Sequence, residues 1–470
     1  MTKTRTLQEV QDPRLFEDMF SHTLPPRIGL DGVVSETIDG VTYDVDLSKA
    51  AERDIVITDT TFRDGQQART PYTSEQVVSL FELLSRLSGP NGVIRQTEFF
   101  LYSKSDREAV DACRNLGLEF PQITGWIRAE SGDLSLVKKM ELAESGMLTS
   151  CSDYHTFLKL KLDRKKAMDK YLGVVKDAIE HGIRPRCHLE DVTRADIYGF
   201  VIPYVQELMR LSEDLPPEQK VKIRLCDTMG FGVSYPGAQL PRSVPKIVLL
   251  MKHECGITGE QLEWHGHNDF HKVFINGTTA WLYGCDALNS TLLGIGERTG
   301  NPPLEAAIIE YAGIKGGLNG IDTRVITEIA DYYRSIATHV PAQYPLVGDN
   351  FNKTRAGIHA GGLLADERIY NIFDTTELLD RSPAVAITDK SGADGVALWV
   401  NNFLGLHGKD RLRKIGMVKI MRWVDDQYSV HARTTAVSDE ELIEQLKLHL
   451  PEQYKAAEAA SRLTTAAGDK

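Results

Sequence analysis

The chain has 470 residues, more than one average domain holds, so we expect one large domain of about 250 residues with smaller units attached to it. Apolar residues make up 42% of the sequence and charged residues 26%, values that are typical of a globular protein and exclude a collagen-like, disordered or membrane-embedded chain. The formal net charge of -12 argues against nucleic acid or an anionic membrane as the main partner, because binding either one requires a concentrated positive surface.

The cysteines and the first residues of the chain indicate its compartment. The six cysteines contain no CxxC pair, so we expect reduced and mostly buried thiols and infer a cytoplasmic location. The first twenty residues carry four acidic side chains and no apolar run, so no secretory or transit signal is predicted. No stretch of the sequence approaches the roughly 20 apolar residues that a membrane-spanning helix needs.

Residues 1–50 are polar and rich in turn-forming residues, and we interpret them as an extension that wraps either the next domain or a partner subunit. From residue 54 onward, short β-branched or apolar runs alternate with segments of helical period, a pattern that is typical of a parallel α/β sheet. Eight such runs begin near Asp54, Val93, Pro121, Met147, Arg184, Lys222, Gln261 and Asp286. Eight parallel strands can close into a barrel.

Segments of helical period fill the gaps between these runs. The first, residues 74–87, follows Thr73, which can form a capping box with Gln76. Three further segments end at glycine: 133–146, 164–182 and 244–256. We therefore predict an α/β fold, a (β/α)8 TIM barrel of about 250 residues, rather than a doubly wound sheet, because no GxGxxG follows the first strand.

The region after the barrel gives a helical segment, a linker rich in proline and glycine, and then mixed loops and helices. We interpret it as an appended C-terminal mixed or helical subdomain region. The predicted parts of the chain are an N-terminal extension (1–50), the TIM-barrel catalytic domain (51–320), a linker with a subdomain (321–400) and a C-terminal helical region (401–470).

Polar residues recur where the predicted strands end, which is where a TIM barrel carries its catalytic groups. His265 and His267 are two residues apart on a predicted strand, so both imidazoles lie on one face and can share a metal ion. Asp64, at the end of the first strand, adds a carboxylate. One HxH pair alone is as often a coincidence, but two imidazoles and a carboxylate with open positions suit manganese, zinc, iron or cobalt rather than calcium.

Three motifs resemble the signatures of one family of metal-dependent barrel enzymes: DTTFRDGQQ, HGHND and GIGERTGN. The family is that of the DRE-TIM metallolyases, which include isopropylmalate, homocitrate, citramalate and Re-type citrate synthases. The resemblance continues into AGIHAGGLLADERIYNIFD, which is similar to the subdomain of the synthases in this group. It runs from Asp59 to Asp374.

The resemblance implies a role for each matching position. Metal ligands are Asp64, His265 and His267. Contacts to the 2-oxo acid are Arg63, facing the keto oxygen, Gln67 beside it, and Arg186 and Thr228 at the carboxylate. Catalytic residues are Arg63, Glu190, His359 and Tyr370, of which the last two enter the barrel of the partner subunit in a homodimer. The implied cofactor is a divalent metal, Mn²⁺ first, with Co²⁺, Mg²⁺ or Zn²⁺ as alternatives.

Structural roles compete with these assignments. Glu190 and Arg186 can form an ion pair that closes the barrel, and His359 can cap a helix or lie in a core. Glu297 and Arg298 are better explained as a pair that supports the metal loop. Ser152 and His155 can contact the substrate or begin a helix, and His188 is interpreted as a core residue.

The sequence also departs from the isopropylmalate-type pattern, with Phe270, His271 and Lys272 after HND and Leu293 where an asparagine is usual. HGHNDFHK, RDGQQAR and the absence of a leucine-binding regulatory domain look most like the Re-type citrate synthases. That resemblance implies condensation of acetyl-CoA with oxaloacetate and hydrolysis of the thioester. Homocitrate synthase, using 2-oxoglutarate, and citramalate synthase are the alternatives.

A second class of reaction shares the barrel and the metal. Carbon-carbon lyases of the hydroxymethylglutaryl-CoA type carry a reactive cysteine in the glycine-rich loop, where this chain reads GIGERTGN. A biotin-dependent carboxyltransferase is a further alternative, although the sequence contains no AMKM motif.

Overall fold

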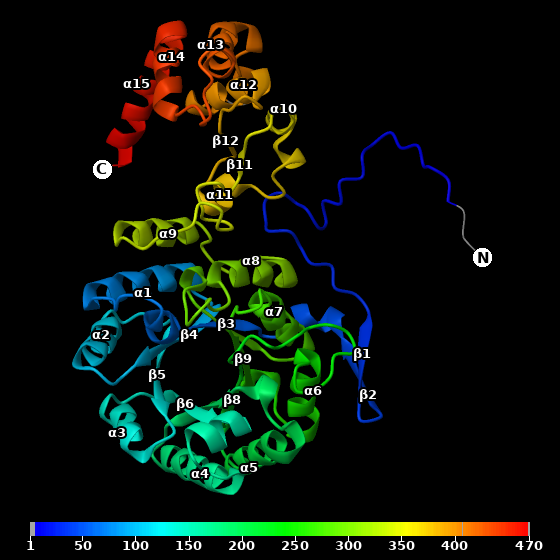
Figure 1. Cartoon of the computed structure of the whole chain (residues 1–470), viewed down its shortest axis with the longest axis vertical. Helices are drawn as coiled ribbons and strands as arrows, with labels where there is room; N and C mark the ends of the chain where they lie inside the picture. Colours follow the sequence, from blue (N-terminus) through cyan, green and yellow to red (C-terminus); the bar gives the residue numbers. More distant parts are fainter. Residues whose placement is uncertain (1–4, 407, 469–470) are drawn as a thin grey trace. The chain divides into compact units, whose positions relative to one another are not determined.

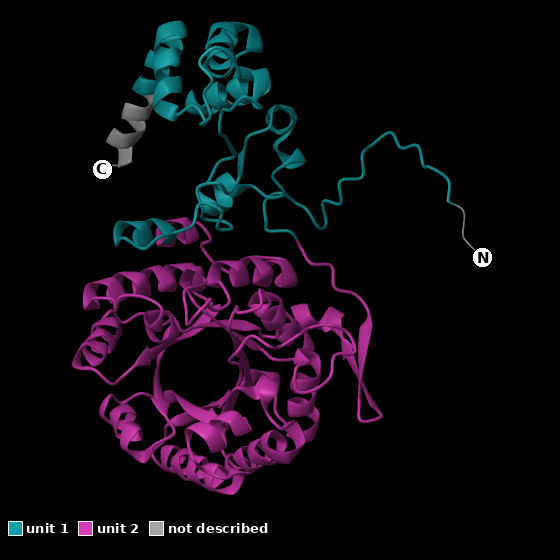
Figure 2. Ribbon diagram, viewed as in Figure 1, with its two compact units in different colours: residues 1–26, 330–470 teal, residues 27–329 magenta. Residues whose placement is uncertain are grey.

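A computed structural model describes residues 5–406 and 408–468. The chain forms two compact units (Figure 2). One comprises residues 27–329, and the other combines residues 1–26 with residues 330–470. Each unit is described by itself.

Eight parallel strands close into a barrel in the larger unit, as the sequence predicted (Figure 1). Their order around the barrel is β10-β3-β4-β5-β6-β7-β8-β9, so each strand pairs with its neighbour along the chain and β10 closes the ring on β3. The strands are β3 Val56–Asp59, β4 Ile94–Phe100, β5 Gln122–Arg128, β6 Glu144–Ser150, β7 Arg184–Glu190, β8 Lys222–Asp227, β9 Leu262–Gly266 and β10 Ala287–Ser290.

A helix follows each strand and covers the outside of the barrel (Figure 1). The helices are α1 Ser74–Ser88, α2 Lys104–Asn115, α3 Ser131–Lys139, α4 Arg164–Glu180, α5 Ile202–Leu211, α6 Val244–Glu254, α7 Val273–Tyr283 and α8 Leu304–Lys315. The predicted capping box is present, since the Thr73 hydroxyl accepts from the Gln76 amide and the Gln76 side chain accepts from the Thr73 amide. A short hairpin, β1 Val33–Ile38 with β2 Val41–Asp46, precedes the barrel.

One predicted helix is shorter than expected. The segment 133–146 was expected to be helical to its glycine, but α3 ends at Lys139 and β6 begins at Glu144. Glu141 has a φ of 52°, a left-handed conformation that no helix continues through. The polar start of β6 hid the strand, because Glu144 faces charged partners inside the barrel instead of an apolar core.

Charged side chains fill the middle of the barrel. Glu98 of β4 accepts from Arg186 of β7 at 2.9 Å and from Arg224 of β8 at 3.0 Å, and Arg224 donates to Glu263 of β9 at 2.7 Å. All four side chains are almost completely buried. Burying a charge is costly unless it is paired and hydrogen-bonded, so removing one partner would leave its neighbour uncompensated.

The same network continues toward the N-terminal ends of the strands. Glu144 pairs with Arg186 and with Lys222, each at 3.1 Å, and Gln96 donates to Glu144 at 3.0 Å. A cavity of about 510 Å³ lies beyond these side chains. Paired charges therefore fill the barrel from its middle to the cavity at the N-terminal ends of the strands.

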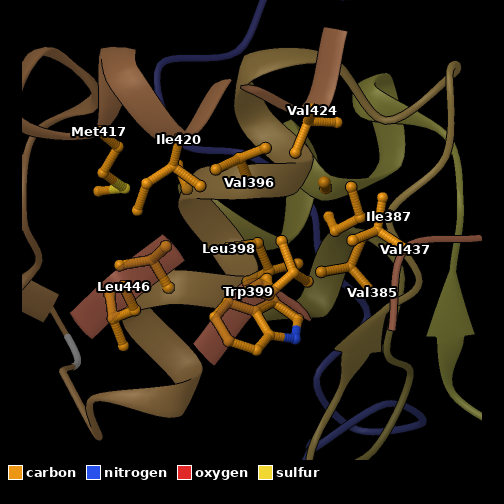
Figure 3. Close-up of a cluster of buried hydrophobic side chains, with 14 of the residues drawn as sticks. Val385, Ile387, Val396, Leu398, Trp399, Met417, Ile420, Val424, Val437 and Leu446 are labelled. Carbon is orange, nitrogen blue, oxygen red and sulfur yellow. The ribbon is translucent and has the colours of Figure 1, made fainter. Parts of the chain in front are cut away.

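The second unit is mainly helical and has an apolar core of its own. Its elements after the α9 helix (Val325–Ser335) are β11 Lys353–Thr354, α10 Gly357–Ala365, α11 Thr375–Leu379, β12 Ala384–Val385, α12 Gly392–Phe403, α13 Val418–Ser429, α14 Asp439–His449 and α15 Pro451–Gly468. Figure 3 shows Trp399 and Leu398 of α12 packed among Ile420 and Val424 of α13 and Leu446 of α14. Burial of this apolar surface stabilises the packing of the helices in this unit.

Two expectations from composition concern the whole chain. The six cysteines are free and buried, as predicted. Within the described residues, none of the helices combines the length and the apolar character that crossing a membrane requires.

Candidate active site

The turn after β3 supplies the first residues of the site. The carbonyl of Thr60 accepts from the amides of Arg63, Asp64 and Gly65, at 3.1, 2.8 and 3.1 Å, which winds residues 61–65 into one π-helical turn. A β-carbon added at Gly65 would lie 3.3 Å from the Ile295 carbonyl oxygen, so this turn packs closely on the loop after β10. Arg63 and Asp64 are both buried at the C-terminal end of the barrel.

Strand β9 supplies two histidines. His265 and His267 alternate along the chain and present their rings to one another, with Nε2 atoms 3.3 Å apart. Asp64 Oδ2 lies 3.7 Å from His265 Nε2 and 3.8 Å from His267 Nε2. The candidate ligand atoms of the three residues lie within 4.8 Å of one another, a spacing at which one ion can bind all of them.

Amide side chains orient this group. His265 Nδ1 lies 2.8 Å from Asn289 Oδ1, and because an amide oxygen only accepts, Nδ1 carries the proton and Nε2 turns its lone pair to the group. Asn301 donates to Asp64 Oδ2 at 2.8 Å. The Nδ1 atom of His267 is buried and meets no hydrogen-bonding partner among the described residues.

The ionisation states also suit a cation. Burial lowers the pKa of His265 to about 3 and lowers that of His267, so both rings are neutral at pH 7. Burial alone would raise the pKa of Asp64, but the charge of the Arg63 guanidinium and the hydrogen bond from Asn301 help to hold that pKa at about 2. Neutral imidazoles and an ionised carboxylate are the forms in which these residues bind a divalent metal, and the three residues therefore fit one.

Arg63 is fixed from two sides. Its Nη1 atom donates to Asp64 at 3.1 Å and its Nε atom to Glu98 at 3.0 Å, while its guanidinium lies 5.2 Å from the centre of the Trp126 ring. Glu98 is itself held by Arg186 and is fully buried. A positive charge held this rigidly beside a metal site can face an oxygen on which negative charge develops.

Glu190 ends β7 at the same end of the barrel. Its carboxylate lies 2.8 Å from His155 Nδ1, 3.5 Å from Lys159 Nζ and accepts from the Ser150 hydroxyl. Burial alone would raise the pKa of Glu190, but the close contact with His155, the hydrogen bond from Ser150 and the Lys159 ammonium hold it at about 2. Glu190 is therefore a carboxylate at neutral pH.

Most of the barrel residues predicted for the site line one cavity of about 270 Å³. They are Arg63, Asp64, Gln67, Glu190, Thr228, His265 and His267. Gln67 is exposed at its edge, and the Thr228 hydroxyl accepts from the Asp191 amide at 2.8 Å. Trp126 and Leu148 add an aromatic and an apolar side chain to the wall.

Arg186 is the exception within the barrel. It lies below this cavity and lines the cavity at the opposite end of the strands. Its Nη1 atom donates to Gln96 and its Nη2 atom to Glu98, each at 2.9 Å. The alternative ion pair with Glu190 is replaced by these contacts, and Glu190 pairs with His155.

The sequence did not indicate several residues of the site. Asn289 and Asn301 orient two members of the candidate metal-binding group Asp64, His265 and His267, called the metal group below, and Glu98 holds Arg63. His188, interpreted as a core residue, is buried but lines the cavity, and it accepts from the Trp126 indole at 3.2 Å. The period-two spacing of Arg186, His188 and Glu190 on one strand face was the available signal for it.

Residues that depart from the isopropylmalate-type pattern lie around the rim. Lys272 precedes α7, donates to the Phe270 carbonyl at 3.3 Å and lies outside the residues that line the cavity. Leu293 is buried in the loop after β10 with a φ of 53°. Arg298 pairs with Asp269 at 2.9 Å instead of Glu297, and both Arg298 and Glu297 line the cavity.

The second unit brings its two predicted residues together. His359 of α10 and Tyr370 have ring centres 4.4 Å apart, and both side chains are exposed. Gly362 permits this contact, since an added β-carbon would lie 2.5 Å from the Tyr370 ring. An exposed imidazole beside an exposed phenol is a pair that can donate and accept protons.

Known proteins resemble the chain along almost its whole length. Residues 54–332 match the model of the HMGL-like family. The chain is 53% identical to citrate (Re)-synthase of Syntrophus aciditrophicus, over 97% of this chain and 72% of that protein, and 49% identical to citrate (Re)-synthase of Clostridium kluyveri, over 93% and 94%. It is 34% identical to 2-phosphinomethylmalate synthase of Streptomyces hygroscopicus, over 93% and 96%. The chain therefore belongs to the HMGL-like family and, within it, groups with the citrate (Re)-synthases.

Proposed function

We propose that the protein condenses acetyl-CoA with oxaloacetate and hydrolyses the resulting thioester, releasing citrate and CoA. The observation that carries this proposal is the identity of about one residue in two with two citrate (Re)-synthases over nearly the whole chain. The cavity that joins the metal group to Arg63 and Glu190 supports it, because condensation needs both proton removal and stabilisation of an oxyanion.

Asp64, His265 and His267 would hold a divalent metal ion, Mn²⁺ in our assignment, with Co²⁺, Mg²⁺ and Zn²⁺ as alternatives. Such an ion supplies Lewis-acid polarisation of the keto oxygen of a 2-oxo acid. Arg63 adds a second positive charge at that oxygen and needs no rearrangement to do so, because Glu98 already holds it. Thr228 and Gln67 are assigned to substrate contact.

Arg186 takes a revised place in this proposal. Its guanidinium is used by Gln96, Glu98 and Glu144, so we assign it to holding Glu98, and through Glu98 to orienting Arg63. Loss of Arg186 would leave the Glu98 carboxylate, which is fully buried, short of one of its cations.

Glu190, His359 and Tyr370 are assigned to proton transfer. Acetyl-CoA must lose a proton from its methyl group, and Glu190 stands ionised at the cavity wall. We propose that His359 and Tyr370 act in the cavity of a partner subunit, which makes a homodimer the active form. Their mutual contact and exposure support an action as one pair.

Thiol release from acetyl-CoA tests the function directly. We expect release with oxaloacetate, loss of release after treatment with a chelator, and recovery on adding Mn²⁺. Release with 2-oxoglutarate or pyruvate in place of oxaloacetate would assign a homocitrate or citramalate synthase instead. Formation of acetyl-CoA from a branched hydroxyacyl-CoA would assign a carbon-carbon lyase.

A further inference from the structure

A row of adjacent aromatic rings and cationic side chains lies at the mouth of the barrel, outside the cavity described above. Arg194 lies 4.4 Å from the centre of the Tyr154 ring and 6.0 Å from that of Phe231. Arg242 lies 5.8 Å from the centre of the Phe231 ring. The Phe231 ring is 5.3 Å from the Phe270 ring, and Lys272 lies 5.5 Å from the latter. We call these six residues the aromatic-cation cluster.

The aromatic-cation cluster is built from four successive connections. Tyr154 follows β6, Arg194 follows β7, Phe231 and Arg242 follow β8, and Phe270 and Lys272 follow β9. These are the C-terminal ends of the strands, the same end that carries the metal group. Rings and cations from four loops meet there without belonging to the mechanism proposed above.

The cluster adjoins the cavity wall. Arg194 pairs with Asp191 at 2.8 Å, and the Asp191 amide donates to the hydroxyl of Thr228, which lines the cavity. Arg298, which also lines it, pairs with Asp269, the residue before Phe270. A ligand whose reactive end is in the cavity can therefore reach the cluster with its other end.

Two cations of the cluster have no acidic partner. Arg242 donates from Nε to the Phe231 carbonyl at 2.8 Å, and Lys272 donates to the Phe270 carbonyl. Among the described residues no carboxylate lies within ion-pair distance of either side chain. In a chain with a net charge of -12, two uncompensated cations beside exposed rings mark a site for an anion.

The rings specify the rest of the ligand. Tyr154 is 54% exposed and Phe270 49%, so each can offer a ring face to a planar group. A purine stacks on such faces, and phosphates are bound by arginine and lysine. A purine nucleotide with several phosphates, joined by a flexible arm to a reactive group, has this combination.

We propose that the aromatic-cation cluster binds the phosphorylated adenosine end of CoA while its thioester lies in the metal-containing cavity. This inference rests on the proposed function for its ligand. The adenine stacks on Tyr154 or Phe270, and its phosphates pair with Arg242 and Lys272.

Another ring-cation contact at this end of the barrel offers a matched control. Arg128 lies 5.8 Å from the centre of the Tyr102 ring, but it is bound by both oxygens of Asp133, at 2.8 and 3.0 Å. Its charge is already neutralised. Arg128→Gln thus removes a cation beside a ring without removing a free charge.

The test compares acetyl-CoA with acetyl-pantetheine, which carries the same thioester without the nucleotide. In Arg242→Gln the ratio of kcat/KM for acetyl-CoA to that for acetyl-pantetheine should fall about tenfold, the loss of one charge-assisted contact. Adding Phe270→Ala should lower the ratio further. Arg128→Gln should keep the wild-type ratio. An unchanged ratio in the Arg242→Gln, Phe270→Ala double variant would overturn the proposal, and so would a fall in Arg128→Gln alone.

Binding without turnover separates this proposal from the proposed function. Adenosine 3′,5′-bisphosphate, titrated calorimetrically, should bind wild type and bind Arg242→Gln about tenfold more weakly. If the wild type releases no thiol with any 2-oxo acid, the proposed function fails while this titration still tests the cluster. Equal affinity of both proteins for the bisphosphate would overturn the site even if thiol release is normal.

Discussion

At the scale of single residues, the active-site groups are set by their immediate partners. His265 is held by Asn289, Asp64 by Asn301 and Arg63 by Glu98, so each group presents one orientation and one charge state. Losing a hydrogen-bonding partner of this kind typically costs about 10- to 100-fold in metal affinity or activity. Glu190 follows the same rule, with His155 as its partner.

Replacing His155 tests that partnership through pH. In wild type the pKa of Glu190 lies at about 2, so the carboxylate is ionised at every pH where the enzyme is assayed. Without His155 the cost of burying Glu190 is only partly offset by Ser150 and Lys159. The pKa of Glu190 therefore rises, and Glu190 becomes protonated as the pH falls through the acidic range. We expect His155→Ala to lower kcat by about tenfold or more and to add an acidic limb to its pH profile.

Two comparisons give that experiment its controls. His155→Gln keeps a hydrogen-bond donor and should retain more activity than His155→Ala. Lys159→Ala removes an exposed cation 3.5 Å from the same carboxylate and should change kcat little, because exposed pairs contribute weakly. A His155→Ala profile that is parallel to wild type at every pH would contradict the assignment.

At the scale of elements, the inward-facing side chains of the strands lie in successive layers along the barrel axis. On β7, Arg186 lies in the ion network, His188 at the cavity wall and Glu190 at the rim, two residues apart each time. Strand β9 repeats this order with Glu263 below His265 and His267. The alternation of a β-strand thus turns sequence position into depth in the barrel.

Gly146 of β6 lies in the layer that contains His188 and Glu98, where little space is left for a side chain. An added β-carbon would lie 2.6 Å from His188 Nε2 and 2.7 Å from Glu98 Oε1. Glu98 is held by buried arginines and cannot move away cheaply, so we expect Gly146→Ala to lower the free energy of unfolding by about 1–3 kcal/mol. Because Glu98 orients Arg63, kcat should fall as well.

Urea denaturation with a second glycine variant measures that cost. Gly173 lies within α4, and nothing stands within 4 Å of a β-carbon added there. Gly173→Ala should leave stability unchanged or raise it by about 0.5–1 kcal/mol, since alanine favours a helix. Equal stability of the two variants would contradict this prediction, because it would show that Glu98 and His188 can move away from the added β-carbon without cost.

At the scale of the whole molecule, two compact units share the proposed catalytic residues. The metal group belongs to the unit of residues 27–329, whereas His359 and Tyr370 belong to the other. If the second pair acts on a partner subunit, each active site in a dimer is assembled from two chains. A chain with a defective metal group can then be paired in one dimer with a chain that lacks His359.

Mixing two inactive variants tests this assembly. Asp64→Ala should lose both metal binding and turnover, and His359→Ala should lose turnover while retaining the metal. When the two are refolded together, mixed dimers contain one site with all its residues intact, and we expect up to about a quarter of wild-type activity, because half the dimers are mixed and half their sites are complete. Mixed samples without activity would contradict action in trans, and an active Asp64→Ala variant would refute the metal site.

Much of this organisation followed from local pattern. Alternating apolar runs and helical periods predicted eight strands, and the barrel confirmed them. The HxH spacing predicted that His265 and His267 share a face, because a strand's period of two is a property of the backbone alone. The family resemblance predicted citrate synthase chemistry, and two citrate (Re)-synthases that match nearly the whole of this chain agree with it.

Tertiary structure alone decided which partner each polar residue takes. Arg186 binds Glu98 from a strand far away in sequence. Asn289 of β10 and Asn301 of the loop after β10 reach the candidate metal ligands. Local spacing sets the face on which a side chain lies, but barrel closure determines which strands face one another. The ion network and the orientation of the metal group are therefore properties of the closed barrel, while the strand count and the paired histidines are properties of the sequence.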